Sequence, residues 1–421
     1  MEERKTLHNY AKILNGSIKR LEDNTKISRK NKETIKRFRT ALTNKGVGDA
    51  RLCRVMEQMR RIAEWLGKDF ETADRADIER IVSEIHSVPT YAFKTIEGYT
   101  VQIKQFYKWF QGNDEEYPAM VRWIRGGINA NRKERLPTEL ITEEDVEKIL
   151  KACAHPRDRA FISLLWETGA RISEIGTAQI KALSFNDGEG QLVVQGKTGW
   201  RKVLLISSVP YLKEWLKYHT HADDKNAPIF TLIYGTKNGL PITYAAIVKT
   251  LRVVMKAAGV NKPTNPHLWR HSRATYLANH LTEAQLCGVL GWVVGSKEAR
   301  TYVHLSGKET NESIRRLYGR ETKTETKKES VLTPRKCEIC GEANEPAREI
   351  CQKCNNPLSI KGAVEKSIRS QGLEERLACI EEVLRIMGAP FDRLFEEKIT
   401  DRDLKAIREK VFVQTKKAVG R

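Results

Sequence analysis

Hydrophobic residues in the N-terminal part of the chain follow the three- and four-residue spacing of amphipathic helices. Segment 49–67 is typical, with Asp49 suited to cap the start of a helix and Gly67 to end it. A second segment, Thr95–Gln111, places aromatic side chains between lysines. We expect the aromatic residues to form a core, while the basic residues of the region fit a solvated face and contact with phosphate equally well. The pattern predicts a helical domain over residues 1–125.

The periodicity stops at residues 126–138, GGINANRKERLPT, which are rich in glycine, proline and charge and are therefore expected to be a linker. Thr142 then begins a helix with acidic residues in its first turn, where the helix dipole favours them. Further on, the alternating strings QLVVQ and RKVLLIS flank the turn GKTGW and predict a β-hairpin. These patterns predict a mixed but mostly helical domain over residues 139–320.

The C-terminal part of the chain begins with a polar, charged run at residues 321–336, which predicts a second linker. A cysteine cluster at 337–358 and a basic helical tail at 359–421 follow. Apolar residues in the tail alternate four and three apart over two heptads: Leu373, Leu377, Ile380, Leu384 and Met387. Two heptads are too few for a coiled coil, so we expect an amphipathic helix that packs or self-associates. The predicted fold class is mainly α.

The excess of positive charge favours a polyanionic partner. Lys and Arg number 74 against 54 Asp and Glu, which gives a net charge of +20. Hydrophobic residues make up 40% of the chain, enough for packed cores. No run reaches the ~18 apolar residues of a membrane-spanning helix, and the first residues lack an apolar signal core. We expect a cytoplasmic, prokaryotic protein associated with the nucleoid and not with a membrane.

The cysteines form two groups. Four are isolated in amphipathic or apolar segments and are expected to be small buried hydrophobes: Cys53, Cys153, Cys287 and Cys379. Four others are spaced C-x2-C-x10-C-x2-C: Cys337, Cys340, Cys351 and Cys354. Two such pairs present thiolates in a tetrahedron suited to zinc, with an iron–sulfur site as the alternative. Because a four-cysteine shell has no open position, we predict a structural zinc ribbon and no role for this metal in catalysis.

Two arginines are candidates to bind a phosphate group. Arg171 lies in TGARISEI, three residues before Glu174, so both are expected on one helix face, where Glu174 could orient Arg171 or could simply form a surface ion pair. Arg270 lies in PHLWRHSRAT, three residues after His267. A guanidinium donates two parallel hydrogen bonds to phosphate oxygens. His267 can hydrogen-bond the phosphate or transfer a proton near neutral pH, whereas His271 is expected to pack beside the site.

A lysine and a tyrosine supply the remaining candidate chemistry. Lys197 lies at the tip of the predicted hairpin, where it could act as a general acid toward a leaving oxygen, with Arg201 and Lys202 as the nearest alternatives. Tyr302 carries a phenol, which titrates near pH ~10. Nearby cations and a proton acceptor would therefore have to help it attack a phosphate.

The strings TGARISEI, GKTGWRK, PHLWRHSRAT and LGWVVGSKEARTYVHLSG resemble the catalytic core of the tyrosine recombinases, the phage-integrase and Xer-type family of DNA strand-exchange enzymes. The resemblance covers roughly residues 139–320; residues 1–125 resemble the family's helical core-binding domain by position and character only. The catalytic residues that it implies are Arg171, Lys197, His267, Arg270 and Tyr302. Trp292 stands where many relatives carry histidine, and its indole N–H can still donate to a phosphate.

The resemblance also implies a mechanism and an assembly. A tyrosine attacks a DNA phosphate to give a 3′-phosphotyrosyl link and a free 5′-hydroxyl, so neither ATP nor a catalytic cofactor is needed. The expected assembly is a homotetramer on two double-stranded DNA recombination sites, with cyclic exchange of a C-terminal segment such as NESIRRLYG. We expect the integrase of a mobile element. The alternatives are an Xer-type chromosome-dimer resolvase, a type IB topoisomerase and a DNA-binding regulator without strand exchange.

Overall fold

The computed structural model describes residues 7–112, 114–125, 139–186, 188–196, 199–296, 298–299, 302, 318 and 330–370. Within them the fold is mostly helical with small antiparallel sheets, which confirms the predicted fold class. The first predicted linker, Lys197 and the tail beyond residue 370 lie outside the described residues. The second predicted linker and the segment NESIRRLYG lie largely outside them. In the part of the chain that the structure describes, no helix has the length and apolar character needed to cross a bilayer.

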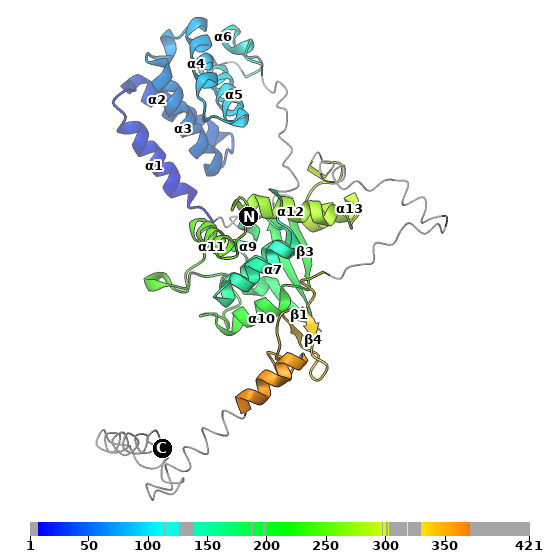
Figure 1. Cartoon of the computed structure of the whole chain (residues 1–421). Helices are drawn as coiled ribbons and strands as arrows, with labels where there is room; N and C mark the ends of the chain where they lie inside the picture. Colours follow the sequence, from blue (N-terminus) through cyan, green and yellow to red (C-terminus); the bar gives the residue numbers. More distant parts are fainter. Residues whose placement is uncertain are drawn as a thin grey trace, which may run out of the picture.

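The N-terminal part forms a helical bundle, drawn in blue and cyan in Figure 1. Its elements are α1 (Tyr10–Glu22), α2 (Arg29–Asn44), α3 (Asp49–Leu66), η1 (Phe70–Thr72), α4 (Arg75–Ser87), α5 (Phe93–Phe110) and α6 (Ala119–Arg122). The aromatic residues of α5 enter the core, as expected: Phe106 is fully buried between the rings of Phe38 and Phe70. Helix α3 ends at Gly67 in the left-handed conformation, but its N-cap is Gly48, one residue before the predicted Asp49.

The second part of the chain is a mixed domain with its own core. Its helices are α7 (Glu143–Ala152), α8 (Pro156–Thr168), α9 (Ile172–Gly176), η3 (Ile180–Ala182), α10 (Val209–Lys217), η4 (Gly235–Lys237), α11 (Tyr244–Ala257), α12 (Pro266–Ala278) and α13 (Glu283–Leu290). Thr142 caps α7 through a reciprocal capping box with Asp145, as the sequence predicts. Helix α8 is buried almost all round and lies at the centre of this core, where it packs against α10 and α12.

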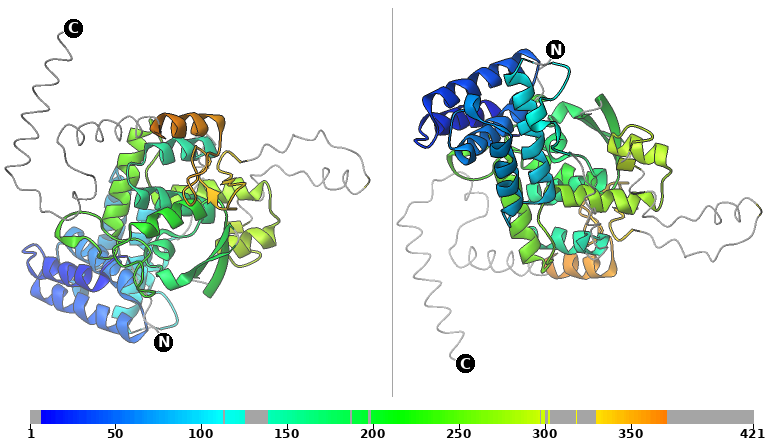
Figure 2. Two further views of the ribbon diagram at one scale, coloured as in Figure 1. Left: turned by 90° about the horizontal axis from the view of Figure 1, so that it is seen from below. Right: turned by 90° about the horizontal axis from the view of Figure 1, so that it is seen from above.

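A three-stranded antiparallel sheet contains the predicted hairpin. Strand β1 (Leu183–Asn186) pairs with β2 (Glu189–Gly196), which pairs with β3 (Gly199–Leu205). Alternate residues of β3, Val203 and Leu205, are buried on the domain core, and Arg201 lies on the same face. The hairpin projects from one side of the domain, close to α13 (Figure 2).

The described residues 330–370, here called the cysteine segment, pack on the mixed domain beside α10 and β1. They lie at the end of that domain opposite to α12 and α13 (Figure 1). The cysteine segment contains the short strands β4 (Arg335–Lys336) and β5 (Ala343–Asn344), and a helix over 360–370 follows. Ion pairs hold it to α10: Lys213 Nζ lies 2.8 Å from Glu342 Oε1, and Arg348 Nη1 lies 3.5 Å from Glu214 Oε1. Leu332 joins the apolar core of the mixed domain. The cysteine segment is therefore docked and not merely tethered.

The start of the described chain contacts the mixed domain before α1 begins. Leu7 packs so closely on α9 that a Cβ atom placed on Gly176 would lie 2.7 Å from Leu7 Cδ2. The ring of His8 lies 4.6 Å from that of Tyr244 in α11, centroid to centroid. The helical bundle therefore touches the mixed domain at its N-terminal end, in addition to its covalent connection through residues 126–138.

Candidate active site

Arg171 and Glu174 form the first half of the predicted phosphate site. The sequence pattern predicted that Arg171 lies within a helix. Instead, Arg171 is the N-cap of α9 and precedes its first turn. Its Nη1 donates to Glu174 Oε1 at 3.0 Å, and its backbone N–H donates to Oε2 at 2.9 Å. The Arg171 side chain is 29% exposed, whereas the Glu174 side chain is 2% exposed. The buried carboxylate of Glu174 thus holds the inner side of the Arg171 side chain, and the outer edge of the Arg171 guanidinium stays accessible.

Glu174 holds a second guanidinium as well. Arg201, from β3, donates through Nη2 to Glu174 Oε2 at 2.7 Å. Burial raises the pKa of the Glu174 carboxyl, but the hydrogen bond and charge of Arg201, followed by the contacts of Arg171, outweigh it and hold the pKa below its usual range. Glu174 is therefore a carboxylate at neutral pH, and it is shared between two cations.

Arg270 lies in α12 and completes a cluster of three arginines. Its side chain is buried, with Nη1 donating to Gly169 O at 2.9 Å and Nη2 to Leu290 O at 2.7 Å. Burial, together with the nearby positive charge of Arg171, lowers the pKa of Arg270 to about 10. Three guanidiniums beside one carboxylate leave a local excess of positive charge, which favours binding of an anion.

Tyr302 lies beside the arginines in a small cluster of apolar side chains. It packs with Ala274, Ala278, Leu286 and Leu290 of α12 and α13 and is 8% exposed. The indole of Trp292 stacks on its ring, with the centroids 5.2 Å apart and an interplanar angle of 14°. The same indole also contacts Arg270, whose Cζ lies 5.3 Å from the indole centroid. Trp292 therefore lies in contact with both Tyr302 and Arg270.

The two histidines of α12 occupy different places. His267 lies exposed in the first turn of the helix, where its backbone N–H donates to Asn265 Oδ1. His271, one turn further along, forms a hydrogen bond through Nδ1 with the Tyr302 hydroxyl, and the two rings are stacked. The sequence had predicted that His271 packs beside the site or supports its residues. Its spacing of four residues from His267, on the same helix face, is the signal that could have assigned it to the site.

The structure therefore brings together Arg171, Arg270, Trp292 and Tyr302 and adds Glu174, Arg201 and His271. Lys197 lies outside the described residues, but its neighbour Gly196 is close to the cluster. A Cβ atom placed on Gly196 would lie 2.6 Å from Glu174 Oε1, the oxygen that holds Arg171. Only a glycine leaves room for that approach of the hairpin.

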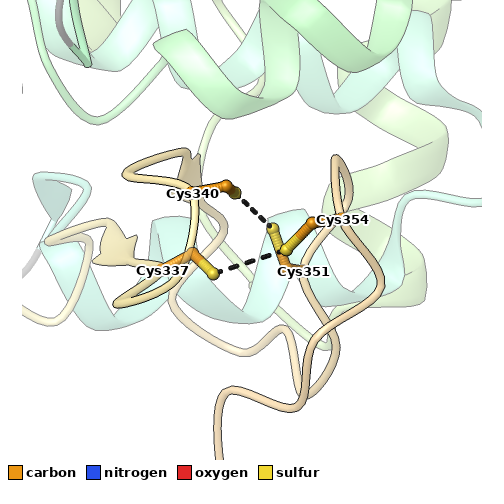
Figure 3. A group of neighbouring side chains, drawn as sticks. All are labelled: Cys337, Cys340, Cys351 and Cys354. Carbon is orange, nitrogen blue, oxygen red and sulfur yellow. Dashed lines mark hydrogen bonds between the residues drawn. The ribbon is translucent and has the colours of Figure 1, made fainter.

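The four cysteines predicted to bind a metal converge at one point (Figure 3). Their sulfur atoms all lie within 4.8 Å of one another, and two of the separations are 3.7 Å for Cys337–Cys354 and 3.6 Å for Cys340–Cys351. Zn–S bonds of ~2.3 Å in a tetrahedron place the sulfurs roughly 3.8 Å apart. The geometry fits a four-thiolate site.

Electrostatics around Cys351 also fit a metal ligand. Burial raises the pKa of this thiol, but N–H groups from the Cys354 and Lys353 backbone and the Asn344 amide outweigh it and lower the pKa to about 6. Such N–H donors stabilise a metal-bound thiolate. Of the other cysteines, Cys53, Cys153 and Cys287 are buried as predicted, and Cys379 lies outside the described residues.

The fold is that of the tyrosine recombinases. A solved structure of the XerH site-specific recombinase bound to palindromic difH substrate aligns with a TM-score of 0.51 and 18% identity over 76% of this chain and 98% of that one. A lambda integrase dimer bound to a COC′ core site aligns with a TM-score of 0.52 and 16% identity over 68% of this chain and 80% of that one.

The sequence comparison points to the same family. Residues 139–309 match the phage integrase family. A curated relative, the tyrosine recombinase XerC of Lactobacillus delbrueckii subsp. bulgaricus, is 28% identical over 198 residues. The match spans 45% of this chain and 64% of that relative, less than two thirds of its length.

Proposed function

We propose that this protein is a site-specific DNA recombinase, the integrase of a mobile element, which cleaves and rejoins double-stranded DNA through a 3′-phosphotyrosyl intermediate. The observation that carries the proposal is the convergence of a buried tyrosine, a histidine on its hydroxyl and an arginine cluster. These groups come from segments far apart in the sequence. Their chemistry matches attack on a phosphodiester.

The arginines bind and stabilise the phosphate. Arg171 presents its exposed edge to the non-bridging oxygens of the phosphate. Arg270, which is buried, provides the second cation. Because both are held by hydrogen bonds before DNA arrives, little reorganisation is needed as charge develops in the transition state. His267, exposed at the start of α12, adds a further hydrogen bond to the phosphate.

Two proton transfers complete the reaction. The phenol of Tyr302 gives its proton to His271 Nδ1 as its oxygen bonds to phosphorus. The bond from phosphorus to the 5′-oxygen breaks, and that oxygen takes a proton from Lys197, which follows β2 in the sequence. The energy of the broken bond is retained in the phosphotyrosyl link, so attack by a 5′-hydroxyl reverses the step without ATP or a catalytic metal.

We propose zinc as the resident ion of the four-cysteine site, in a structural role. The soft, four-thiolate donor set and the close sulfur spacing support this choice. The partners that we propose are two recombination sites in duplex DNA, bound by a homotetramer in the cytoplasm of a prokaryote. The roles of the predicted linkers, and of the helical N-terminal domain as a clamp on the duplex, belong to the same proposal.

A suicide substrate tests the proposed activity. Duplexes made from the DNA that flanks the gene are nicked close to each candidate cleavage point, so that the short 5′-hydroxyl fragment diffuses away and traps the adduct. The wild-type protein is expected to form a covalent complex that survives denaturing electrophoresis, and Tyr302→Phe is expected to form none while still shifting the DNA. Equal adduct from both proteins would contradict the assignment of the nucleophile.

The same DNA substrates, together with the DNA that flanks the gene, distinguish the proposed integrase from the alternative functions. A gel shift without any adduct supports a DNA-binding regulator, and relaxation of supercoiled DNA without recombination supports a topoisomerase. Direct repeats at the ends of an inserted element support an integrase, whereas resolution of chromosome dimers supports an Xer-type role.

A further inference from the structure

The first described residues of the chain contact the helix that carries half of the phosphate site. Leu7 packs against the core of the mixed domain. The three atoms nearest to a Cβ atom placed on Gly176 would all belong to the Leu7 side chain, at 2.7, 2.9 and 3.2 Å. Gly176 is the last residue of α9 and is buried. The start of the helical bundle thus lies on the short helix that Arg171 caps and that contains Glu174 (Figure 1).

The contact with Leu7 accounts for the glycine at position 176, whereas the backbone does not. The φ angle of Gly176 is not in the left-handed region, so an alanine would fit the same backbone. Alanine is also the better helix former. A Cβ atom would, however, lie only 2.7 Å from Leu7 Cδ2. The missing side chain of Gly176 is therefore the space that Leu7 occupies.

Helix α9 is too short to be stable without outside contacts. It has five residues, Ile172–Gly176, and isolated helices shorter than ~12 residues are marginal in water. One side of α9 is held by the core of the mixed domain, in which Ile175 is fully buried. Leu7 covers its last turn, two residues beyond Glu174. Without that cover, water reaches the last turn and the helix end frays more easily.

The hydrogen bonds of α9 connect this last turn to the phosphate-binding arginine. The backbone carbonyl of Arg171 accepts from the N–H groups of Glu174 and Ile175, at 2.8 and 3.3 Å. In return, the Glu174 carboxylate accepts from the backbone N–H and from the guanidinium of Arg171. Because α9 is little more than one turn long, fraying at its end loosens the same residues that orient the Arg171 guanidinium.

The helical bundle holds Leu7 with little slack. Asn9, two residues later, caps α1 through its side chain. The carbonyl oxygen of Tyr10 accepts from Cys53 Sγ of α3 at 3.5 Å, which ties the start of α1 to the bundle. Two residues span roughly 7 Å at most. A displacement of the bundle by more than this distance must therefore withdraw Leu7 from Gly176.

We propose that Leu7 is a positioning residue: it couples the place of the helical bundle to the order of α9, and through Glu174 to the guanidinium of Arg171. The proposal rests on the proposed function, in which Arg171 binds the phosphate. With the bundle in contact, Leu7 covers α9 and the first arginine is held in place. With the bundle displaced, α9 frays and the phosphate site is incomplete. Strand cleavage is thereby confined to a protein whose two domains touch.

Amide hydrogen exchange in the DNA-free, full-length protein tests the contact through a double-mutant cycle. In Leu7→Ala, the amides of Ile175 and Thr177 are expected to exchange about tenfold faster. Gly176→Met places a flexible apolar side chain where Leu7 lies, so Leu7→Ala in that background is expected to change exchange less than about twofold. Leu14→Ala, in α1 but packed on the core of the bundle, is the control. No effect of Leu7→Ala, or equal effects in both backgrounds, would overturn the proposal.

Cleavage of the suicide substrate tests the consequence for the reaction. At saturating DNA, Leu7→Ala is expected to cleave about tenfold more slowly than wild type, because Arg171 is held less firmly. The double variant with Leu7→Ala and Gly176→Met is expected to return to within about threefold of the wild-type rate, since the methionine covers α9 instead. Leu7→Met keeps an apolar side chain of similar volume and should cleave like wild type. A slow rate that Gly176→Met does not restore would contradict the positioning role.

These results distinguish failure of the positioning role from failure of the proposed function. If wild type and Leu7→Ala cleave equally fast, the positioning role is wrong and the recombinase proposal stands. If wild type forms no adduct on any substrate, the proposed function is wrong, and the role of Leu7 in cleavage falls with it. The exchange measurement needs no DNA, so it still decides whether Leu7 holds α9.

Discussion

His271 Nδ1 forms a hydrogen bond with the hydroxyl group of Tyr302, and the two rings stack with centroids 5.8 Å apart. This contact joins the middle of α12 to a tyrosine 31 positions further along the chain. In the proposed reaction it makes His271 the acceptor of the phenol proton. We therefore predict that His271→Phe, which keeps the ring but removes the nitrogen, slows adduct formation about 100-fold.

Single-turnover cleavage of the suicide substrate measures this effect. DNA binding is expected to change little, because His271 contacts the tyrosine and not the exposed edge of Arg171. His280→Phe is the matched control: this histidine follows the same helix, and its ring lies 5.0 Å from that of Tyr276, centroid to centroid. Wild-type rates in His271→Phe would remove the histidine from the mechanism.

Gly196 provides the space in which the hairpin meets the arginine cluster. A Cβ atom there would lie 2.6 Å from Glu174 Oε1, the oxygen that holds Arg171. Gly196→Ala is therefore expected to displace Glu174 and to lower the cleavage rate about tenfold or more, through misplaced phosphate-binding groups.

Gly288→Ala is the control for that substitution. Gly288 lies within α13, and a Cβ atom there meets nothing within 4 Å. Alanine is favoured over glycine inside a helix by about 1 kcal/mol, so this variant should melt at the same or a slightly higher temperature and cleave normally. Equal activity of both variants would show that the hairpin tolerates movement at Gly196.

Metal removal should loosen the cysteine segment and leave the chemistry intact. We expect one equivalent of zinc in the purified protein and its loss, with partial unfolding of residues 330–370, in Cys351→Ser. Limited proteolysis and metal analysis check both. The rate of the suicide cleavage step should change less than about threefold, because no proposed catalytic residue lies in this segment. A loss of cleavage in proportion to zinc would assign the ion a larger role.

The docking of the cysteine segment should weaken as pH rises. Burial, with the adjacent carboxylate of Glu214, raises the pKa of Glu345 to about 7. A group whose pKa is raised on folding adds stability below its unfolded pKa, and this stability is lost as pH rises through the folded value. Between pH 6 and pH 8 the docked segment should thus become less stable.

Calorimetry of Glu345→Gln checks this dependence. Glutamine resembles the neutral acid, so the variant should lose less melting temperature than wild type over that pH interval. Glu342→Gln, which removes an ion pair with Lys213 in the same contact, should keep the wild-type slope. Parallel slopes in all three proteins would mean that Glu345 does not titrate in this range.

Local features of the fold were predictable from sequence because they depend on neighbouring residues. The capping box of Thr142, the end of α3 at Gly67 and the β2–β3 hairpin each follow from side chains a few positions apart. Errors at helix starts were of one residue or little more: Gly48 caps α3 in place of Asp49, and Arg171 precedes α9.

The parts of the site that sequence reasoning missed depend on contacts between distant segments. Arg201 was considered as an alternative cation for the hairpin tip, but it turns inward to Glu174. Strand alternation held the signal, since Arg201 shares a face with Val203 and Leu205. Nothing in the spacing of residues could show that Glu342 and Lys213 meet, because their distance along the chain carries no information on how the segments pack.

Leu7 and His8, packed on α9 and α11, give the helical bundle a second attachment besides its covalent one. Admission of an unbroken duplex between the two domains then requires these side chains to detach first. Loading onto DNA would be gated by a unimolecular undocking event, so its observed rate should level off at high DNA concentration and not climb without limit. Residues 7 and 8 would thereby limit the rate at which the protein closes on DNA.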